Sequence, residues 1–271
     1  MKHFNMFFTK NNVSHETFKY FLLFVIISIV MKKVLILQFR PEKEVSDDEF
    51  KAFLKYGGLN EKEVERIEAH EGFKDIDLDD YSALIIGGSP YSVSDGKKTD
   101  AQIKTEEKLF KLMREVKKKD FPYWGNCYGL GTIATACNGI VSQDKYSESV
   151  GAVEILLNEN AKKDDLLSGL DEKFYAFVGH KEACQIVPPD AILLASSKTC
   201  PIQLIRYGKN VYASQFHAEL DSDGLALRIE YYKDKGYFKS EDAEKLIKEG
   251  YKYDIKVPMK FFKRFIDKYH R

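Results

Sequence analysis

The sequence predicts an α/β fold, with a mostly parallel central sheet, flanking helices and a small antiparallel sheet. From residue 31 onward, short apolar runs rich in β-branched residues alternate with charged, amphipathic segments, which is typical of a sheet covered by helices. The runs 34–37 and 83–86 are apolar on both faces, as in strands buried inside a parallel sheet. Between residues 150 and 216 strand-like runs follow one another closely, which indicates antiparallel hairpins.

The parallel part is expected in the first half of the chain. Its strands are predicted at 34–39, 83–86 and 121–124. Between residues 100 and 118 apolar residues recur at helical spacing among lysines and glutamates, so a crossover helix should join two of these strands. A second helix should follow Gly129, and Asn138 and Gly139 give it a C-terminal cap.

The second half combines hairpins with C-terminal helices. Strands are predicted at 153–157, 174–178, 192–195, 202–207 and 211–216, and helices at 225–235, 240–248 and 257–269. Residues 207–210, Tyr-Gly-Lys-Asn, form the predicted turn of one hairpin. No internal repeat or long linker divides the chain, so we expect one domain at 31–271.

Residues 1–30 are predicted to lie outside that domain, as an apolar extension that is not native or is disordered. Residues 20–30 form a nearly continuous apolar run, which is too short to span a bilayer comfortably. No small-x-small cleavage site follows this run, and a membrane-tethering helix is the alternative interpretation.

Charge and cysteine content narrow the classes of partner. Lys plus Arg and Asp plus Glu number 42 each, so no strong field draws the protein onto nucleic acid or acidic lipid. The four cysteines, Cys127, Cys137, Cys184 and Cys200, lie far apart and form no C-x-x-C pair, which predicts neither a metal site nor disulfides. We therefore expect a cytoplasmic protein without a cofactor.

Cys127 is the predicted nucleophile. Residues 125–129, Gly-Asn-Cys-Tyr-Gly, form a G-x-C-x-G segment between a predicted strand and a predicted helix, the cysteine counterpart of a nucleophile elbow. Glycine on both sides is needed where side chains would collide with the neighbouring strand and helix. The helix that begins here is expected to lower the pKa of the thiol. A lone cysteine is more often a small buried hydrophobe, but the two glycines argue against that interpretation here.

His217 is the predicted proton acceptor, and Glu219 its partner. His217 follows a predicted strand, and Glu219, two residues later, can accept a hydrogen bond from the second ring nitrogen. The alternative for a lone strand-end histidine is an exposed surface residue.

An oxyanion hole is expected from two backbone amides. Gly87 and Gly88 directly follow a buried strand, where bare amides can approach a reacting carbonyl. The predicted donors are the amides of Gly88 and of Tyr128, the residue after the nucleophile. A simple turn is the alternative for this glycine pair.

The segments 87–90, 125–129 and 215–219, taken in order, resemble those of class I glutamine amidotransferases. The likeness extends to the stand-alone members that are named for their similarity to the amidotransferase domain of GMP synthase. It implies a flavodoxin-like fold, attack of Cys127 on the side-chain amide of glutamine, and a γ-glutamyl thioester that is then hydrolysed. The ammonia would pass to a separate acceptor synthetase.

The resemblance also predicts substrate-binding residues, and the chain departs from the family pattern beside them. Gly87, Gly131, His180 and Lys181 are the candidates for binding substrate. Leu130 and Gly131 stand where the family usually has His-Gln, and that glutamine normally helps to hold the substrate. Two alternatives therefore stay open: a γ-glutamyl hydrolase acting on a modified γ-glutamyl amide, and a non-catalytic module of the same fold.

Two further departures lie beside the predicted triad. Asn126 replaces the apolar residue that the family usually has before the cysteine, and Ala218 replaces the usual proline.

Overall fold

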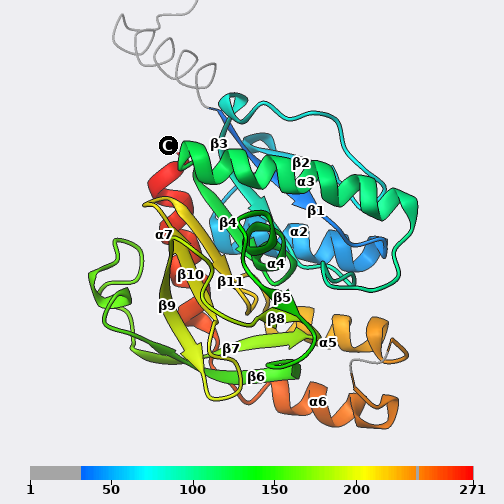
Figure 1. The fold of residues 1–271 in the computed structure, drawn as a ribbon. Coiled ribbons are helices and arrows are strands. Elements are labelled where there is room, and N and C mark those ends of the chain that lie inside the picture. Colours follow the sequence, from blue (N-terminus) through cyan, green and yellow to red (C-terminus); the bar gives the residue numbers. More distant parts are fainter. Residues whose placement is uncertain (1–31, 236–237, 271) are drawn as a thin grey trace, which may run out of the picture. The chain divides into compact units, whose positions relative to one another are not determined.

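A nine-stranded sheet organises the protein, whose computed structural model describes residues 32–235 and 238–270 (Figure 1). The strand order is β2-β1-β3-β4-β11-β10-β9-β6-β7. The first five strands run parallel: β2 (Val64–Glu68), β1 (Lys33–Gln38), β3 (Tyr81–Ile86), β4 (Tyr123–Asn126) and β11 (Val211–Ser214). The predicted extension at residues 1–30 lies outside the described residues.

The antiparallel strands continue the same sheet. They are β10 (Leu204–Tyr207), β9 (Ala191–Ser197), β6 (Glu148–Leu157) and β7 (Lys173–His180). The predicted hairpin turn at 207–210 is confirmed, because Tyr207 pairs with Val211 and Gly208 has φ +51°. A separate antiparallel pair joins β5 (Val141–Ser142) to β8 (Ala183–Cys184), and the predicted fold class is confirmed.

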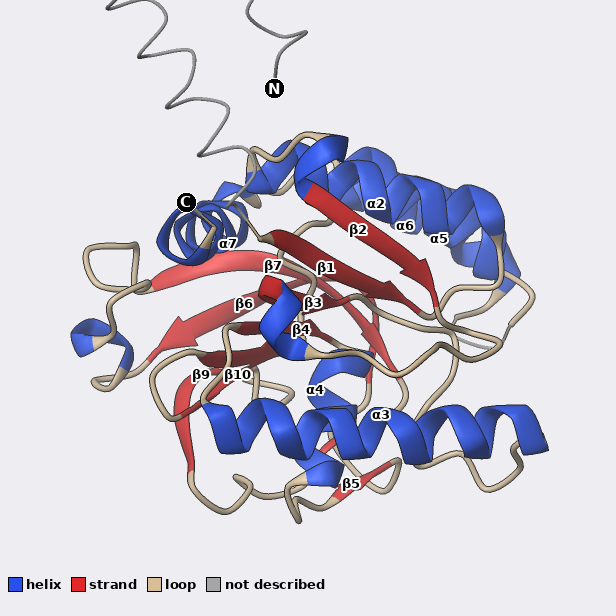
Figure 2. Cartoon of the chain, turned by 90° about the horizontal axis from the view of Figure 1, so that it is seen from above, coloured by secondary structure: helices blue, strands red, loops and turns tan. Residues whose placement is uncertain are grey.

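Helices cover both faces of the sheet (Figure 2). On one face lie α2 (Lys43–Gly57), α5 (Ser222–Tyr232), α6 (Ala243–Gly250) and α7 (Lys256–Tyr269); on the other lie α3 (Asp100–Lys119) and α4 (Tyr128–Ala136). Short 3-10 turns occur at Glu61–Glu63, Leu78–Asp80, Ala161–Lys163 and Ser240–Asp242. Within the described ranges, no helix has both the length and the apolarity that a bilayer crossing requires.

The aromatic part of the core lies between the sheet and α7. Trp124 of β4 packs against Phe261, Phe262 and Phe265, with ring centroids 5.4–5.8 Å apart. Together with the apolar layer beneath α3 and α4, these contacts bury both faces of the central strands. The two-sided burial accounts for the continuous apolar runs of the sequence.

α2 and β2, which lie between the first two predicted strands, were not predicted from the sequence. The segment that forms β2, Val-Glu-Arg-Ile-Glu, is an edge strand in which only Val64 is buried, so no apolar run marks it. Four residues of α2 that face inward are Val45, Ser46, Glu49 and Phe53, and two of these are polar. A helix that buries polar groups gives a weak amphipathic signal.

Candidate active site

A strained backbone at Cys127 forms the centre of the site. Cys127 has φ +50° and ψ −94° and joins β4 to α4. A Cβ on Gly125 would lie 2.4 Å from the Tyr123 hydroxyl, and one on Gly129 would lie 3.0 Å from the Ile86 carbonyl oxygen. Both glycines are therefore needed for close approach, as expected at an elbow.

The parallel pairing of β4 with β11 brings the predicted base to the elbow. Asn126 lies opposite Ser214, and the Cys127 amide donates to the Ser214 carbonyl at 2.7 Å. His217 comes three residues after β11, and Cys127 and His217 line one cavity of about 50 Å³. The cavity thus lies at the carboxyl ends of the parallel strands, where α/β proteins usually bind ligands.

The geometry around His217 fixes the role of each ring nitrogen. Nδ1 lies 2.9 Å from Glu219 Oε1 and 3.1 Å from Arg228 Nη1. The fully buried carboxylate favours the Nδ1–H form, which leaves Nε2 as the acceptor. Burial lowers the pKa of His217; Glu219 opposes this shift, and the guanidinium of Arg228 adds to it. The imidazole is therefore neutral in the free protein, the state that a general base needs.

Glu219 is fully buried and held by several donors. The Asn126 side-chain amide donates to its Oε2 at 2.8 Å, and Arg228 Nη2 donates to its Oε1 at 3.0 Å. Burial alone would raise the pKa of Glu219, but His217 and Arg228 together lower it well below its usual range. Asn126, a departure from the family pattern, thus helps to hold the carboxylate.

The prediction of a lowered pKa for Cys127 is wrong. Burial raises the pKa of this thiol to about 12, and the carboxylate of Glu182 acts in the same direction against Arg40 and Arg228. The amino end of α4 favours the thiolate, but the desolvation of the sulfur and a carboxylate from the segment after β7 disfavour it. Cys127 is therefore a thiol beside a neutral imidazole, rather than one half of an ion pair.

The glycine pair after β3 meets a buried carboxylate. The Gly88 amide donates to Glu49 Oε1 at 3.2 Å, and a Cβ on Gly87 would lie 2.4 Å from Glu49 Oε2. Glu49 is held in turn by Gln38 at 3.0 Å and by Arg40 at 2.9 Å. The Gly88 amide is thus engaged, and the oxyanion role predicted for it requires Glu49 to release it.

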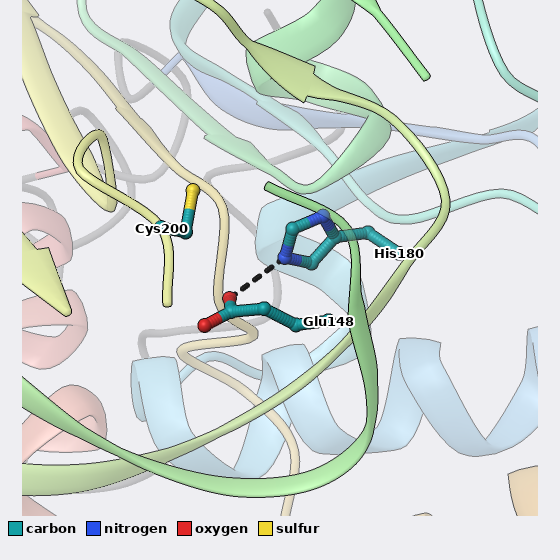
Figure 3. Close-up of side chains that lie close together, drawn as sticks. All are labelled: Glu148, His180 and Cys200. Atoms are coloured by element: carbon teal, nitrogen blue, oxygen red, sulfur yellow. Dashed lines mark hydrogen bonds and ion pairs between the residues drawn. The ribbon is translucent and has the colours of Figure 1, made fainter. Parts of the chain in front are cut away.

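His180 lies in a polar cluster beside Glu148 (Figure 3) and is not among the described residues that line the cavity. Its Nε2 lies 2.8 Å from Glu148 Oε2, and its Nδ1 lies 2.8 Å from the Glu182 carbonyl oxygen. Gln203 also donates to Glu148, at 2.6 Å. Both ring nitrogens are engaged, so His180 links β7 to β6 and does not favour direct substrate contact. Lys181 also lies off the cavity wall, and its Nζ donates to the Lys235 carbonyl at 3.2 Å.

Two groups of side chains among the described residues have the spacing of a metal-ligand set, and one of them is this cluster. Ligand atoms of Glu148, His180 and Cys200 lie within 4.8 Å of one another, as do those of Glu49, His217 and Glu219. In the first set, Glu148 already accepts from His180, and the Cys200 thiol donates to the Ile202 carbonyl at 3.6 Å. These internal bonds connect the groups in the absence of an ion.

Gly131 lies against the carboxylate of Glu182. A Cβ at Gly131 would be 2.9 Å from Glu182 Oε1. Glu182 accepts hydrogen bonds from the Val93 amide at 3.0 Å and from the Ser94 amide at 2.9 Å, so it has little freedom to move aside. The glutamine that the family usually has at this position would therefore collide with Glu182.

Four residues of the site were not predicted from the sequence. Arg40, Glu49, Arg228 and Tyr232 form a buried polar cluster around His217, with Arg40 donating to the Tyr232 hydroxyl at 3.2 Å. They come from α2, α5 and the end of β1, and no sequence motif connects these segments. Only their shared position at one edge of the sheet brings them together.

Comparison with known proteins identifies the family. The model of the class I glutamine amidotransferase family matches residues 33–227. The chain belongs to this family. Over 147 residues it is 29% identical to a GMP synthase [glutamine-hydrolyzing] from Borreliella burgdorferi, and the match covers 54% of this chain but only 26% of that protein. A GMP synthase subunit from Methanobrevibacter smithii is 29% identical over 149 residues, which cover 54% of this chain and 68% of the subunit.

Solved structures of amidotransferases share the fold of this chain. A glutamine amidotransferase from Thermotoga maritima superposes with a TM-score of 0.69 at 18% identity, covering 88% of this chain and 98% of that one. One from Methylobacillus flagellatus gives a TM-score of 0.64 at 18% identity, covering 89% and 96% of the two chains.

Proposed function

We propose that this protein hydrolyses the side-chain amide of glutamine with a Cys127–His217–Glu219 triad and releases ammonia. The observation that carries the proposal is that a strained elbow cysteine and a neutral histidine, held by a buried carboxylate, line one cavity. An imidazole in the Nδ1–H form is the general base that a cysteine nucleophile requires.

The chemistry follows from the protonation states. As the sulfur of Cys127 bonds to the amide carbon, His217 Nε2 takes the thiol proton, and Glu219 stabilises the imidazolium. The imidazolium then gives that proton to the leaving nitrogen, so the C–N bond breaks, ammonia departs and a γ-glutamyl thioester remains. Water, deprotonated by His217, attacks the thioester; glutamate leaves and the thiol is restored. The amides of Tyr128 and of Gly88, once Glu49 releases it, would stabilise the oxyanion.

The test is an ammonia-release assay with glutamine and a panel of γ-glutamyl amides. Cys127→Ser and His217→Asn should each lower turnover by at least about a hundredfold, because nucleophile and base act as a unit. Cys137→Ser, at a buried cysteine that ends α4, is the matched control and should retain activity. Equal rates for the wild type and the two triad variants would refute the proposal and favour a non-catalytic module.

A γ-glutamyl hydrolase is the second candidate. The observation that favours it is the close approach of Glu182 to Gly131. A carboxylate thus occupies the place of the glutamine that the family usually uses to hold the substrate. Release of glutamate from γ-glutamyl amines, with no ammonia from free glutamine, would select this function.

A separate acceptor synthetase is the partner that we propose for the released ammonia. Two relatives, from Thermoplasma volcanium and Methanobrevibacter smithii, are named as single subunits of a GMP synthase. If the proposal holds, a synthetase subunit from the same organism should raise the rate of glutamine hydrolysis when the two proteins are mixed.

A further inference from the structure

Glu148, His180 and Cys200 bring three different kinds of metal ligand together, and none of them is among the described residues that line the cavity (Figure 3). Glu148 begins β6, His180 ends β7, and Cys200 lies in the turn between β9 and β10. All three are buried, and their ligand atoms lie within 4.8 Å of one another. In a tetrahedral zinc site with bonds of about 2.0–2.3 Å, ligand atoms lie about 3.3–3.8 Å apart. Shifts of about 1 Å therefore bring these three atoms to one ion.

His180 has the orientation that metal-binding histidines usually have. Its Nδ1 lies 2.8 Å from the Glu182 carbonyl oxygen, so Nδ1–H donates to the backbone. Ligating histidines commonly donate the second ring N–H in this way, which fixes the tautomer. Nε2 is then directed at Glu148 Oε2, 2.8 Å away. Two lone pairs would meet at this contact unless a proton or a metal ion lies between them.

The carboxylate of Glu148 is held through one oxygen, and its other oxygen faces the cluster. Ser197 Oγ donates to Oε1 at 3.0 Å, and the Thr199 hydroxyl donates to the same oxygen. Oε2 faces His180 and the side-chain amide of Gln203. Ligating carboxylates are usually oriented by such hydrogen bonds to the oxygen that does not bind the metal.

Gln203 supplies a fourth polar group. The side chain is fully buried, and its Oε1 has no hydrogen-bond partner within 32–235 and 238–270. Its Nε2 lies 2.6 Å from Glu148 Oε2, so the amide group lies against the cluster. Without an ion, the amide presents its donor to the carboxylate. With an ion, rotation about the last side-chain bond lets the unpaired oxygen face the metal.

Exchange of two protons for one zinc ion leaves the buried charge unchanged. The hydrogen-bonded cluster holds an imidazolium, a carboxylate and a neutral thiol, so its net charge is zero. When Zn²⁺ binds, the proton on His180 Nε2 and the thiol proton of Cys200 pass to solvent. The imidazole, the carboxylate and the thiolate then bind the ion, and the net charge is again zero. Binding therefore buries no unpaired charge.

We propose that Glu148, His180 and Cys200 bind one zinc ion, with the carbonyl oxygen of Gln203 as the fourth ligand, in a structural site that fastens the turn after β9 to β6 and β7. Nitrogen and sulfur donors favour zinc over magnesium or calcium, which prefer oxygen. The ligands come from separate segments of the chain, so cysteine spacing could not predict this site. None of these residues belongs to the triad, and the inference does not depend on the proposed function.

The test is metal binding by the full chain carrying Cys127→Ser, in which the thiol of the cavity cannot bind the ion. After treatment with a chelator, and with a phosphine reductant present, the protein should bind one zinc ion per chain and retain it through dialysis. Cobalt(II) in its place should give a thiolate-to-metal charge-transfer band. X-ray absorption of the zinc form should find one sulfur at about 2.3 Å and nitrogen or oxygen atoms at about 2.0–2.2 Å.

Adding Cys200→Ser should abolish the charge-transfer band and weaken zinc binding by at least about a hundredfold, because loss of an outer-shell partner alone costs about 10–100-fold. Cys184→Ser is the matched control and should keep both, since Cys184 is also buried, lies on β8 and is not in the ligand set. No retained zinc, a coordination shell without sulfur, or a band that survives Cys200→Ser would overturn the inference. The X-ray absorption measurement still decides the question if Cys200→Ser does not fold.

Discussion

Gly88→Ala should lower kcat by about a hundredfold by displacing His217. The added Cβ would lie 2.6 Å from His217 Cε1 and 2.5 Å from Arg40 Nη2, whereas ordinary contact begins at 3.4 Å. Relief of both contacts requires the His217 ring to move by 3.4 minus 2.6, or about 0.8 Å, and Arg40 Nη2 to move by 3.4 minus 2.5, or about 0.9 Å. A displacement of about 1 Å in a catalytic group costs about a hundredfold in rate. The Gly88 backbone is not in the left-handed region, so strain of φ does not contribute.

The assay is kcat for ammonia release, with thermal unfolding measured in parallel. Gly96→Ala is the control, because Gly96 lies in the same connection between β3 and α3 and its added Cβ would meet nothing within 4 Å. Gly96→Ala should keep wild-type kcat. A Gly88→Ala protein whose kcat stays within about threefold of wild type would refute the reasoning.

Glu148→Gln should destabilise the protein by about 3 kcal/mol, because it breaks a buried pair with His180, and this corresponds to about 6–12 °C in melting temperature. Burial opposes ionisation of Glu148, but the hydrogen bond from His180 lowers its pKa below 4.5. The stability difference between wild type and Glu148→Gln should therefore be complete above pH 4.5. It should shrink as the pH falls through the pKa that Glu148 has in the folded protein. Thermal unfolding at pH 7 and below pH 4 tests this, with exposed Glu154→Gln on the same strand as control. Asn126→Leu should lower kcat about tenfold with little change in KM, since Glu219 loses one donor; an unchanged kcat would contradict the role given to Asn126.

Patterns that are local in the chain could be read from the sequence. The two-sided apolar runs predicted the central strands, and the glycines around Cys127 predicted the elbow, because each signal depends on neighbours a few residues away. The edge strand β2 and the helix α2 were missed because their burial depends on what packs against them.

The polar environment of the site was not predictable in the same way. Glu49 lies 39 residues from Gly88 in the chain, and Arg228 lies 11 residues from His217, with no motif connecting either pair. A carboxylate in the middle of a helix is usually exposed to solvent. That Glu49 is buried could be seen only from the folded structure, in which the side chain is 0% exposed. The error about the pKa of Cys127 has the same origin, since Glu182 reaches the elbow through tertiary structure alone.

The raised pKa of Cys127 makes a final prediction about its reactivity. With a pKa of about 12, about one thiol in a hundred thousand is ionised at pH 7, and the fraction rises tenfold per pH unit. Alkylation by iodoacetamide, followed by mass spectrometry, should therefore accelerate about tenfold per unit from pH 7 to pH 10 without a plateau. Glu182→Gln should raise the rate at fixed pH, because it removes a neighbouring negative charge.

A plateau below pH 8 would contradict this prediction, since it would indicate a preformed thiolate–imidazolium pair. Under the predicted behaviour, the pKa of His217 lies below 6.5 while that of Cys127 is about 12, so proton transfer between them is unfavourable by more than about 7 kcal/mol before substrate binds. Such a transfer becomes feasible only when the sulfur bonds to carbon as the proton leaves. The site would then react slowly with simple electrophiles at neutral pH and faster with an amide positioned in the cavity.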